Sequence, residues 1–415
     1  MELKQGYKQA EAGVIPEDWN VMPLGAICTA VLDCHHSTPV WTRTGAVVIR
    51  NQNIRDGKLD LSEPSFTDER HFAERTRRAV PRFGDLVITR EAPMGLVCSI
   101  PKGLKCCLGQ RMVLLRINHD AVDSRYILYA LLSESVQRSI SVAGGTGSTV
   151  SNLRIPVLKE LKILAPAKSE QRAIAMVVSD VDTQISSLDQ LIAKKRDIKQ
   201  AAMQQLLTGR HRLPGYAGTW KRKLLKDCVS CPPSYGINAP AVPYSDRLPR
   251  YIRITDITED GRFAPDALVS VKDANAHCYQ LSQGDLVFAR TGASVGKSYR
   301  YTPNDGPLVY AGFLIRIRPD PAILLASFLA AFVSTDTYWN WVRLMSMRSG
   351  QPGINGREYG QLPVPLPEIG EQYAIADVLS DMDTELAALE RKRDKTRALK
   401  QGMMQELLTG RIRLA

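Results

Sequence analysis

The sequence lacks the long apolar runs of membrane and secreted proteins. Its longest apolar run, from Ala322 to Val333, is much shorter than the ~20 residues that cross a bilayer. The N-terminal segment has no apolar core of the kind that signal peptides contain. Hydrophobic residues make up 44% of the chain and charged residues 23%, as in ordinary folded proteins. We therefore expect a folded, cytoplasmic protein without a membrane partner.

Cysteine is sparse, with eight among the 415 residues. The one C-x-x-C pair, Cys228 and Cys231, has no second cysteine or histidine pair at a spacing that would complete a zinc site. Disulfides are rare in cytoplasmic proteins. We expect reduced, mostly buried thiols and no metal site.

Motifs for catalysis are also missing. The segment 291–298, TGASVGKS, is one residue too short for a phosphate-binding loop, so the sequence favours a tight turn between two strands. The segment 231–234, CPPS, lacks the acidic or amide residue and the aromatic residue that amino-methyltransferases place around two prolines. We find no glycine-rich cofactor turn and no pairing of a nucleophile with a base. The sequence predicts no catalytic residue and no cofactor of its own.

Acidic residues are outnumbered, with 43 Asp and Glu against 54 Lys and Arg, which gives a net charge of +11. Most of this surplus lies on residues 1–169, at +5, and on residues 214–370, at +4. A basic excess indicates a polyanionic partner such as DNA, although it carries no information about the fold.

The chain does contain a long internal repeat. Residues 170–213 match residues 371–414 at a constant offset of 201 without a gap, and 24 of the 44 positions are identical. Weaker matches continue upstream at nearly the same offset, such as GDLVITR (84–90) with GDLVFAR (284–290). The chain is therefore a duplicated unit of about 200 residues, whose two copies should fold alike.

Each strongly repeated segment is predicted to form one long helix. Neither segment contains proline, and apolar residues step by four and three from Ile174 to Ile192 and from Ile375 to Leu389. This spacing is typical of the seam between two packed helices. Ser169 stands where an N-cap belongs, and Gly410 where a helix ends in a left-handed residue.

The charges along these helices indicate that they pack antiparallel. Acidic residues dominate the first half of each helix and basic residues the second half, so an antiparallel pair sets opposite charges side by side. With flush ends the expected neighbours are Lys194 and Glu385, Arg397 and Asp182, and Lys400 and Asp180.

The remaining blocks are rich in Val, Ile, Thr and Gly and indicate short strands separated by turns, with one apolar helix late in each block, at 125–137 and 323–341. We predict an α+β fold in which two β-rich mixed domains are joined by two long antiparallel coiled-coil helices, with pseudo-twofold internal duplication. The predicted segments are a first domain at 1–168, a central helix at 169–213, a second domain at 214–369 and a C-terminal helix at 370–415.

Several motifs recur at matching places in the two copies. Both helical segments open with Glu-Gln and close with LLTGR-x-RL, and the two domains open with IPEDWNVMPLG (15–25) and GTWKRKLLKD (218–227). Together with the GDLV segments and YIRITDITEDG (251–261), these motifs make the whole chain similar to the specificity (S) subunits of type I restriction–modification enzymes.

This resemblance implies a non-catalytic DNA-binding subunit. Two target-recognition domains would each read one half of a bipartite asymmetric site in double-stranded DNA. The helices would set the spacer between the half-sites and dock two methyltransferase (M) subunits, which restriction (R) subunits then join. S-adenosylmethionine, ATP and magnesium would belong to those partners. The first domain departs from the second at TREAPMGL (89–96), which lacks the basic turn at Lys297, so the resemblance leaves its target open.

Polar residues near glycine-containing turns are the predicted DNA contacts, because Arg pairs with guanine and Asn or Gln with adenine in the major groove. Arg90 and Arg290 end equivalent strands, so a structural ion-pair role stays open for both. The candidates are Arg50, Asn51, Arg90, Thr146, Ser148 and Asn152 in the first domain, and Arg253, Thr255, Arg290, Thr291, Lys297, Arg348, Gln351 and Asn355 in the second.

Two other functions remain as alternatives. A self-sufficient DNA methyltransferase or nuclease would need a cofactor or metal site, and none is visible in the sequence. A coiled-coil scaffold that binds nucleic acid without sequence specificity is the other alternative, which footprinting of the assembled complex distinguishes.

Overall fold

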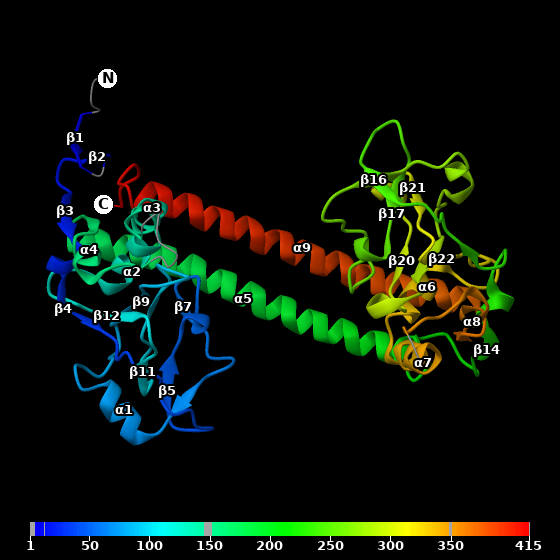
Figure 1. The fold of residues 1–415 in the computed structure, drawn as a ribbon, viewed down its shortest axis with the longest axis horizontal. Coiled ribbons are helices and arrows are strands. Elements are labelled where there is room, and N and C mark those ends of the chain that lie inside the picture. Colours follow the sequence, from blue (N-terminus) through cyan, green and yellow to red (C-terminus); the bar gives the residue numbers. More distant parts are fainter. Residues whose placement is uncertain (1–4, 12, 145–151, 348–350, 415) are drawn as a thin grey trace. The chain divides into compact units, whose positions relative to one another are not determined.

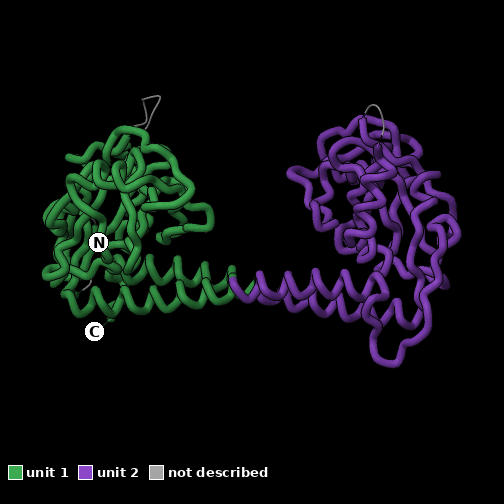
Figure 2. Tube along the Cα trace, turned by 90° about the horizontal axis from the view of Figure 1, so that it is seen from below, with its two compact units in different colours: residues 1–189, 391–415 green, residues 190–390 purple. Residues whose placement is uncertain are grey.

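The chain forms two compact units. One comprises residues 1–189 together with 391–415, and the other comprises residues 190–390 (Figure 2). Both long helices cross the boundary, so each unit contains one half of each helix. The computed structural model describes residues 5–11, 13–144, 152–347 and 351–414.

The first unit is built mainly from short strands. These strands are β1 (Tyr7–Ala10), β2 (Gly13–Pro16), β3 (Asn20–Pro23), β4 (Cys28–Asp33), β5 (Ala46–Ile49), β6 (Ile54–Arg55), β7 (Lys58–Leu59), β8 (Phe66–Thr67), β9 (Leu86–Thr89), β10 (Val97–Ser99), β11 (Cys106–Leu108), β12 (Met112–Ile117) and β13 (Lys162–Ala165). Its shorter helices are α1 (Glu69–Arg75), α2 (Ser124–Leu132), α3 (Glu134–Ala143) and α4 (Ile155–Lys159).

The second unit has a similar composition. Its strands are β14 (Lys221–Leu224), β15 (Ser234–Tyr235), β16 (Ala241–Pro243), β17 (Arg250–Ile252), β18 (Val269–Val271), β19 (Leu286–Ala289), β20 (Ser298–Arg300), β21 (Leu308–Tyr310), β22 (Leu314–Ile317) and β23 (Pro363–Leu366). Its shorter helices are α6 (Ala326–Phe332), α7 (Asp336–Ser346) and α8 (Gly356–Tyr359).

The two units repeat one sheet topology. The antiparallel sheet β10-β9-β12-β4 of the first unit corresponds to β20-β19-β22-β15 of the second. Each unit also has a second sheet around one parallel pair, β11 with β5 and β21 with β17. Residues 291–297 lie in the turn between antiparallel β19 and β20, and Ser298 begins β20, so the turn predicted from the short glycine spacing is present. The predicted α+β fold with internal duplication is confirmed.

The prediction of one late apolar helix in each domain is wrong, because the structure has two helices at each place. The first breaks between α2 and α3 at Ser133, whose hydroxyl accepts from the backbone N–H of Val136. The second breaks between α6 and α7 at Thr335, which caps α7 through Tyr338. A Ser or Thr side chain that bonds to the backbone in this way favours a new helix start over continuation.

The two long helices are α5 (Lys168–Leu206) and α9 (Ile369–Leu407), each of 39 residues. The predicted seam is largely buried, with Ile174 and Val178 at 0% exposure. Helix α5 begins at Lys168, so Ser169 lies in its first turn and is not the N-cap. After α9, Gly410 has φ +72°, and the N–H groups of Gly410 and Arg411 bond to the carbonyls of Leu407 and Glu406 as in a Schellman motif.

Ion pairs show that α5 and α9 pack antiparallel (Figure 1). The predicted register is a few residues off. Glu385 pairs with Lys195 rather than Lys194, Asp182 with Lys400 rather than Arg397, and Arg397 with Asp189. The seam residues fix which faces meet, but they leave the axial offset to packing at the helix ends. None of the helices among the described residues is long and apolar enough to cross a bilayer.

The closing motif of each long helix binds the opening motif of the other. In the first unit, Arg413 holds the buried Glu170 carboxylate with Nε 2.7 Å from Oε1, and the Trp19 indole N–H donates to the same carboxylate at 3.2 Å. The guanidinium of Arg413 also lies over the Trp19 ring. Arg212, Glu371 and Trp220 repeat this arrangement in the second unit. The repeated Glu and Arg residues therefore close each unit.

Candidate DNA interface

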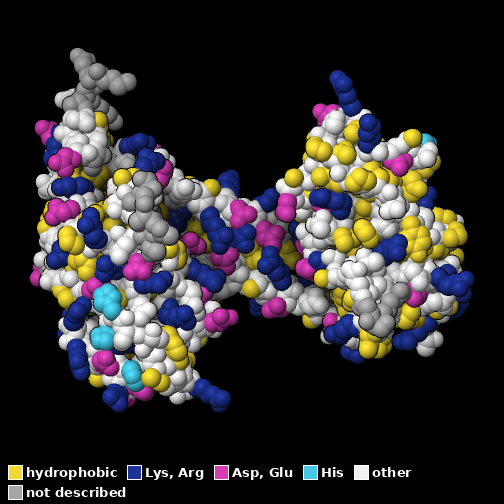
Figure 3. All heavy atoms as spheres, viewed as in Figure 1, with side chains coloured by type: hydrophobic (Ala, Val, Ile, Leu, Met, Phe, Trp, Pro, Cys, Tyr) yellow, Lys and Arg dark blue, Asp and Glu magenta, His cyan; other side chains and the backbone are white. Residues whose placement is uncertain are grey.

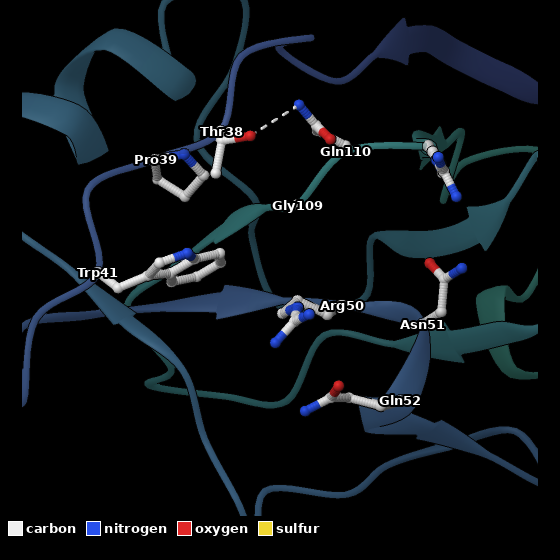
Figure 4. Close-up of a pocket in the computed structure, with 9 residues that line it drawn as sticks. Thr38, Pro39, Trp41, Arg50, Asn51, Gln52, Gly109 and Gln110 are labelled. Atoms are coloured by element: carbon white, nitrogen blue, oxygen red, sulfur yellow. Dashed lines mark hydrogen bonds between the residues drawn. The ribbon is translucent and has the colours of Figure 1, made fainter.

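A groove of about 390 Å³ opens on the surface of the first unit (Figure 4). Two turns that follow buried strands supply most of its walls, one after β5 and one between β11 and β12. The groove holds two guanidinium groups and three side-chain amides. Its lining residues are Thr38, Pro39, Trp41, Arg50, Asn51, Gln52, Gly109, Gln110 and Arg111.

Arg50 lies at the centre of this groove, and its guanidinium carbon is 5.2 Å from the centre of the Trp41 ring. Trp41 is 47% exposed, which is unusual for so large an apolar side chain. On the opposite wall the Gln110 amide donates to the Thr38 hydroxyl at 3.3 Å. Arg111 pairs with Glu91 at 3.0 Å, so its charge is partly neutralised.

Arg50 has an equivalent in the second unit, Arg253. Each arginine follows a buried strand and precedes a 3₁₀ turn, Asn51–Asn53 or Ile254–Asp256. In each turn the third side chain accepts the backbone N–H of the arginine, through Asn53 Oδ1 at 3.0 Å or Asp256 Oδ2 at 2.7 Å.

The third residue of the turn differs between the two domains, and this difference changes the contacts of the arginine. Asp256 also binds the Arg253 guanidinium, with Nη2 2.7 Å from Oδ1, and this hydrogen bond raises the pKa of Arg253 above its usual value. Asn53 carries no charge that would hold Arg50 in this way. Arg253 is consequently part of the framework, whereas Arg50 projects into a groove.

Arg90 and Arg290 form a second equivalent pair at the ends of β9 and β19. Their carbonyls accept from Leu153 at 2.7 Å and from Ile354 at 2.8 Å, which confirms that the backbones match. The residue facing each arginine differs. Arg90 Nη1 lies 2.8 Å from Oδ2 of Asp33, with only 14% of its side chain exposed. Arg290 instead lies over the Tyr235 ring, 4.9 Å from its centre.

The other candidates of the first domain divide between this surface and the undescribed segments. The Asn51 amide donates to the Ala92 carbonyl at 3.3 Å, and Asn152 accepts from Arg90 at 3.3 Å. Thr146 and Ser148 lie outside the described residues, as does Arg348 of the second domain.

The remaining candidates of the second domain lie in several different turns. Thr291 pairs with Gly353 through a backbone bridge, and Gln351 and Thr255 are exposed. Asn355 caps α8, since its Oδ1 accepts from the N–H of Glu358 at 2.9 Å. Lys297 Nζ lies 2.6 Å from Glu259 Oε1.

Seven of the nine groove residues were not predicted from the sequence: Thr38, Pro39, Trp41, Gln52, Gly109, Gln110 and Arg111. Gln110 and Arg111 follow Gly109 in a turn between two strands, which is the signal that selected the other candidates. No such signal marks Trp41, which lies in a long loop before β5. On the face shown in Figure 3, basic and acidic side chains are interspersed over both units.

The comparisons with known proteins agree with this geometry. A family profile described as "Type I restriction modification DNA specificity domain" matches residues 16–194 and 250–396. The chain belongs to this family. It is a DNA specificity subunit of a type I restriction–modification system and non-catalytic, as predicted.

Specificity subunits from other organisms align over most of the chain. The specificity subunit of the type I restriction enzyme EcoKI from Escherichia coli K12 is 21% identical, over 97% of this chain and 90% of the relative. That of EcoBI from Escherichia coli is 22% identical, over 76% and 70%. The crystal structure of an S subunit from M. genitalium has the same fold, with a TM-score of 0.58, 16% identity and 98% coverage of both chains.

A further solved structure comes from a study of complex assembly and conformational transition of the type I system. It matches 96% of this specificity subunit with a TM-score of 0.60 and 17% identity, and 99% of its own chain is covered. The fold is therefore that of subunits in this class of complex.

Proposed function

We propose that this specificity subunit reads a bipartite asymmetric site in double-stranded DNA, one half with each recognition domain. The observation that carries the proposal is a repeated framework with different side chains at its exposed strand ends. Asn51 and Gln52 of the first domain correspond to Ile254 and Thr255 of the second. Two domains that share one backbone framework but carry different side chains suit two different half-sites.

The long helices are proposed to fix the spacer and to dock two M subunits, with R subunits joining that complex. The duplication supports two M subunits, because two like surfaces on α5 and α9 would bind two copies of one partner. S-adenosylmethionine, ATP and magnesium would then serve catalysis in the partners. The division into domains 1–168 and 214–369 with helices 169–213 and 370–415 is part of this proposal.

Twelve of the fourteen candidates named above remain predicted contacts with DNA, and Arg90 and Arg253 are assigned to the framework because each is paired with a carboxylate. Many of them are expected to touch phosphates rather than bases, because most protein–DNA hydrogen bonds go to the backbone. Those contacts position the domain, and a smaller number select the sequence.

A domain exchange tests the proposal. Residues 214–366 are replaced with the corresponding segment of a relative, and the chimera is expressed with the M subunit. Mapping of methylated sites in host DNA should show one half-site retained and the other changed. A change in both halves, or none in either, would refute the division of labour. The purified chain alone should transfer no methyl group from labelled S-adenosylmethionine.

A further inference from the structure

The two recognition domains each contain the same two arginine positions, but opposite members are neutralised. In the first domain Arg90 is paired with Asp33 at 2.8 Å, and Arg50 lies over Trp41. In the second domain the earlier arginine, Arg253, is the one paired with a carboxylate, that of Asp256. The later arginine, Arg290, lies over Tyr235.

The two aromatic rings beneath Arg50 and Arg290 are unusually exposed. Trp41 is 47% exposed and Tyr235 is 42% exposed, so neither ring serves mainly to fill a core. A ring beneath a guanidinium limits its motion through a cation–π contact. Arg50 Nη1 also donates to the Ser65 hydroxyl at 3.5 Å and Arg290 Nη1 to the Gly312 carbonyl at 3.4 Å, and the other N–H groups of each guanidinium form no hydrogen bond in the part of the chain that the structure describes. Within the described residues, neither Arg50 nor Arg290 lies within ion-pair distance of a carboxylate.

We propose that the first domain reads a guanine through Arg50 and the second domain reads a guanine through Arg290. Each guanidinium, held on its ring, presents two N–H groups to O6 and N7 of guanine in the major groove. Arg90 is equivalent in backbone position to Arg290, and Arg253 to Arg50. Both Arg90 and Arg253 donate their N–H groups to carboxylates, and they maintain the framework. Trp41 and Tyr235 are positioning residues that act through the arginines.

The groove around Arg50 supports base reading over phosphate binding alone. Gln52 is exposed beside the guanidinium and offers an amide group of the kind that recognises adenine, whereas the Gln110 amide nitrogen donates to the His36 carbonyl at 2.7 Å and to the Thr38 hydroxyl and belongs to the wall of the groove. The corresponding turn of the second domain has Gly312 and Phe313 in place of Gln110 and Arg111, and the Phe313 side chain is 59% exposed. The two domains should therefore accept different bases beside their guanines.

This inference rests on the proposed function, and the chain offers its own matched controls. The full-length chain is assembled with its M subunit, and methylated motifs are mapped for wild type, Arg50→Ala, Arg290→Ala, Arg90→Ala and Arg253→Ala. The first two variants should lose discrimination at one base pair, on the order of tenfold to a hundredfold, each in a different half-site. The other two should keep the wild-type motif even where they lower the melting temperature.

A second variant separates reading from folding. Asn53→Asp places a carboxylate at the position equivalent to Asp256, so it should bind the Arg50 guanidinium. Discrimination at the same base pair should then fall although the arginine is still present. Trp41→Phe should retain discrimination better than Trp41→Ala, because it keeps a ring. A relaxed motif in Arg90→Ala or Arg253→Ala, or an unchanged motif in Arg50→Ala or Arg290→Ala, would overturn the inference. A wild-type complex without any sequence preference would instead refute the proposed function.

Discussion

Asn53 has an amide where Asp256 has a carboxylate, and this one difference changes the contacts of the neighbouring arginine. The residues occupy the same turn and accept the same backbone N–H. Only the carboxylate also binds the guanidinium. At the scale of single residues, the proposed reading of DNA by Arg50 therefore depends on the neighbouring Asn53, which binds only the backbone of the arginine.

The buried Glu170 carboxylate offers a first prediction. Arg413→Ala leaves this group without its cation, and a buried charge that loses its partner costs about 3–5 kcal/mol. Glu170 is 6% exposed, so a cost near the lower end is expected in the unfolding free energy of the first unit. Chemical denaturation that is monitored by hydrogen exchange measures this unfolding free energy. Arg411→Ala, at an exposed pair with Glu406, is the control and should cost under about 1 kcal/mol.

Buried thiols give a prediction for alkaline pH. Burial raises the pKa of Cys98 and of Cys106 to about 12, whereas an unfolded thiol ionises near pH 8.5. The unfolded chain therefore loses protons first, and each such thiol removes stability as pH rises from about 8.5 towards 12, at up to about 1.4 kcal/mol per pH unit. Cys98→Ala should make this alkaline loss shallower. An unchanged slope between pH 9 and 11 would contradict the argument.

At the scale of elements, the periodicity of the sequence predicted the long helices and how they pack. It missed features that depend on the geometry of single side chains. The two long helices, their seam and their antiparallel order follow from apolar spacing and graded charge. The helix breaks at Ser133 and Thr335 were missed because a capping hydroxyl is also compatible with a continuous helix. The stacking of Arg50 on Trp41 joins a loop to a strand end, and no spacing rule links those positions.

Equivalent ion pairs between α5 and α9 differ in burial, and this yields another prediction. Lys400 and Asp182 have 14% and 15% of their side chains exposed, and the Tyr129 hydroxyl also donates to Asp182 at 2.9 Å. Lys199 pairs with Asp383, which is 54% exposed. Lys400→Ala should cost about 2 kcal/mol, below the loss at a fully buried pair. Lys199→Ala should cost under about 1 kcal/mol. Thermal unfolding of both variants decides between this ranking and equal effects.

At the scale of the whole molecule, each unit combines residues from both copies of the repeat. The first unit takes Glu170 from the first copy and Arg413 from the second. A single copy has a glutamate and an arginine of this kind, but they lie at opposite ends of its long helix. Duplication within one chain thus replaces association between two chains.

The half-chain 1–213 should therefore form a twofold dimer in which Arg212 of one copy binds Glu170 of the other. With M subunits it is expected to modify an interrupted palindrome made of the first half-site and its inverted repeat. Molecular mass in solution and methylation mapping test this outcome, and Arg212→Ala should weaken the dimer. A monomer, or a dimer that still requires the asymmetric site, would disprove the prediction.

The contact between Arg413 and Glu170 also sets an order of events during synthesis. Ribosomes add about 5–20 residues per second, so residues 391–415 emerge on the order of ten to forty seconds after residue 189. The second unit is one continuous stretch and can fold while later residues are still being added, whereas the first unit can close only after residues 391–414 have been made. We expect a message truncated before Arg413 to yield a product with one closed unit and one open unit, and the open unit should be more sensitive to proteases. The first unit therefore closes only in chains that extend through Arg413.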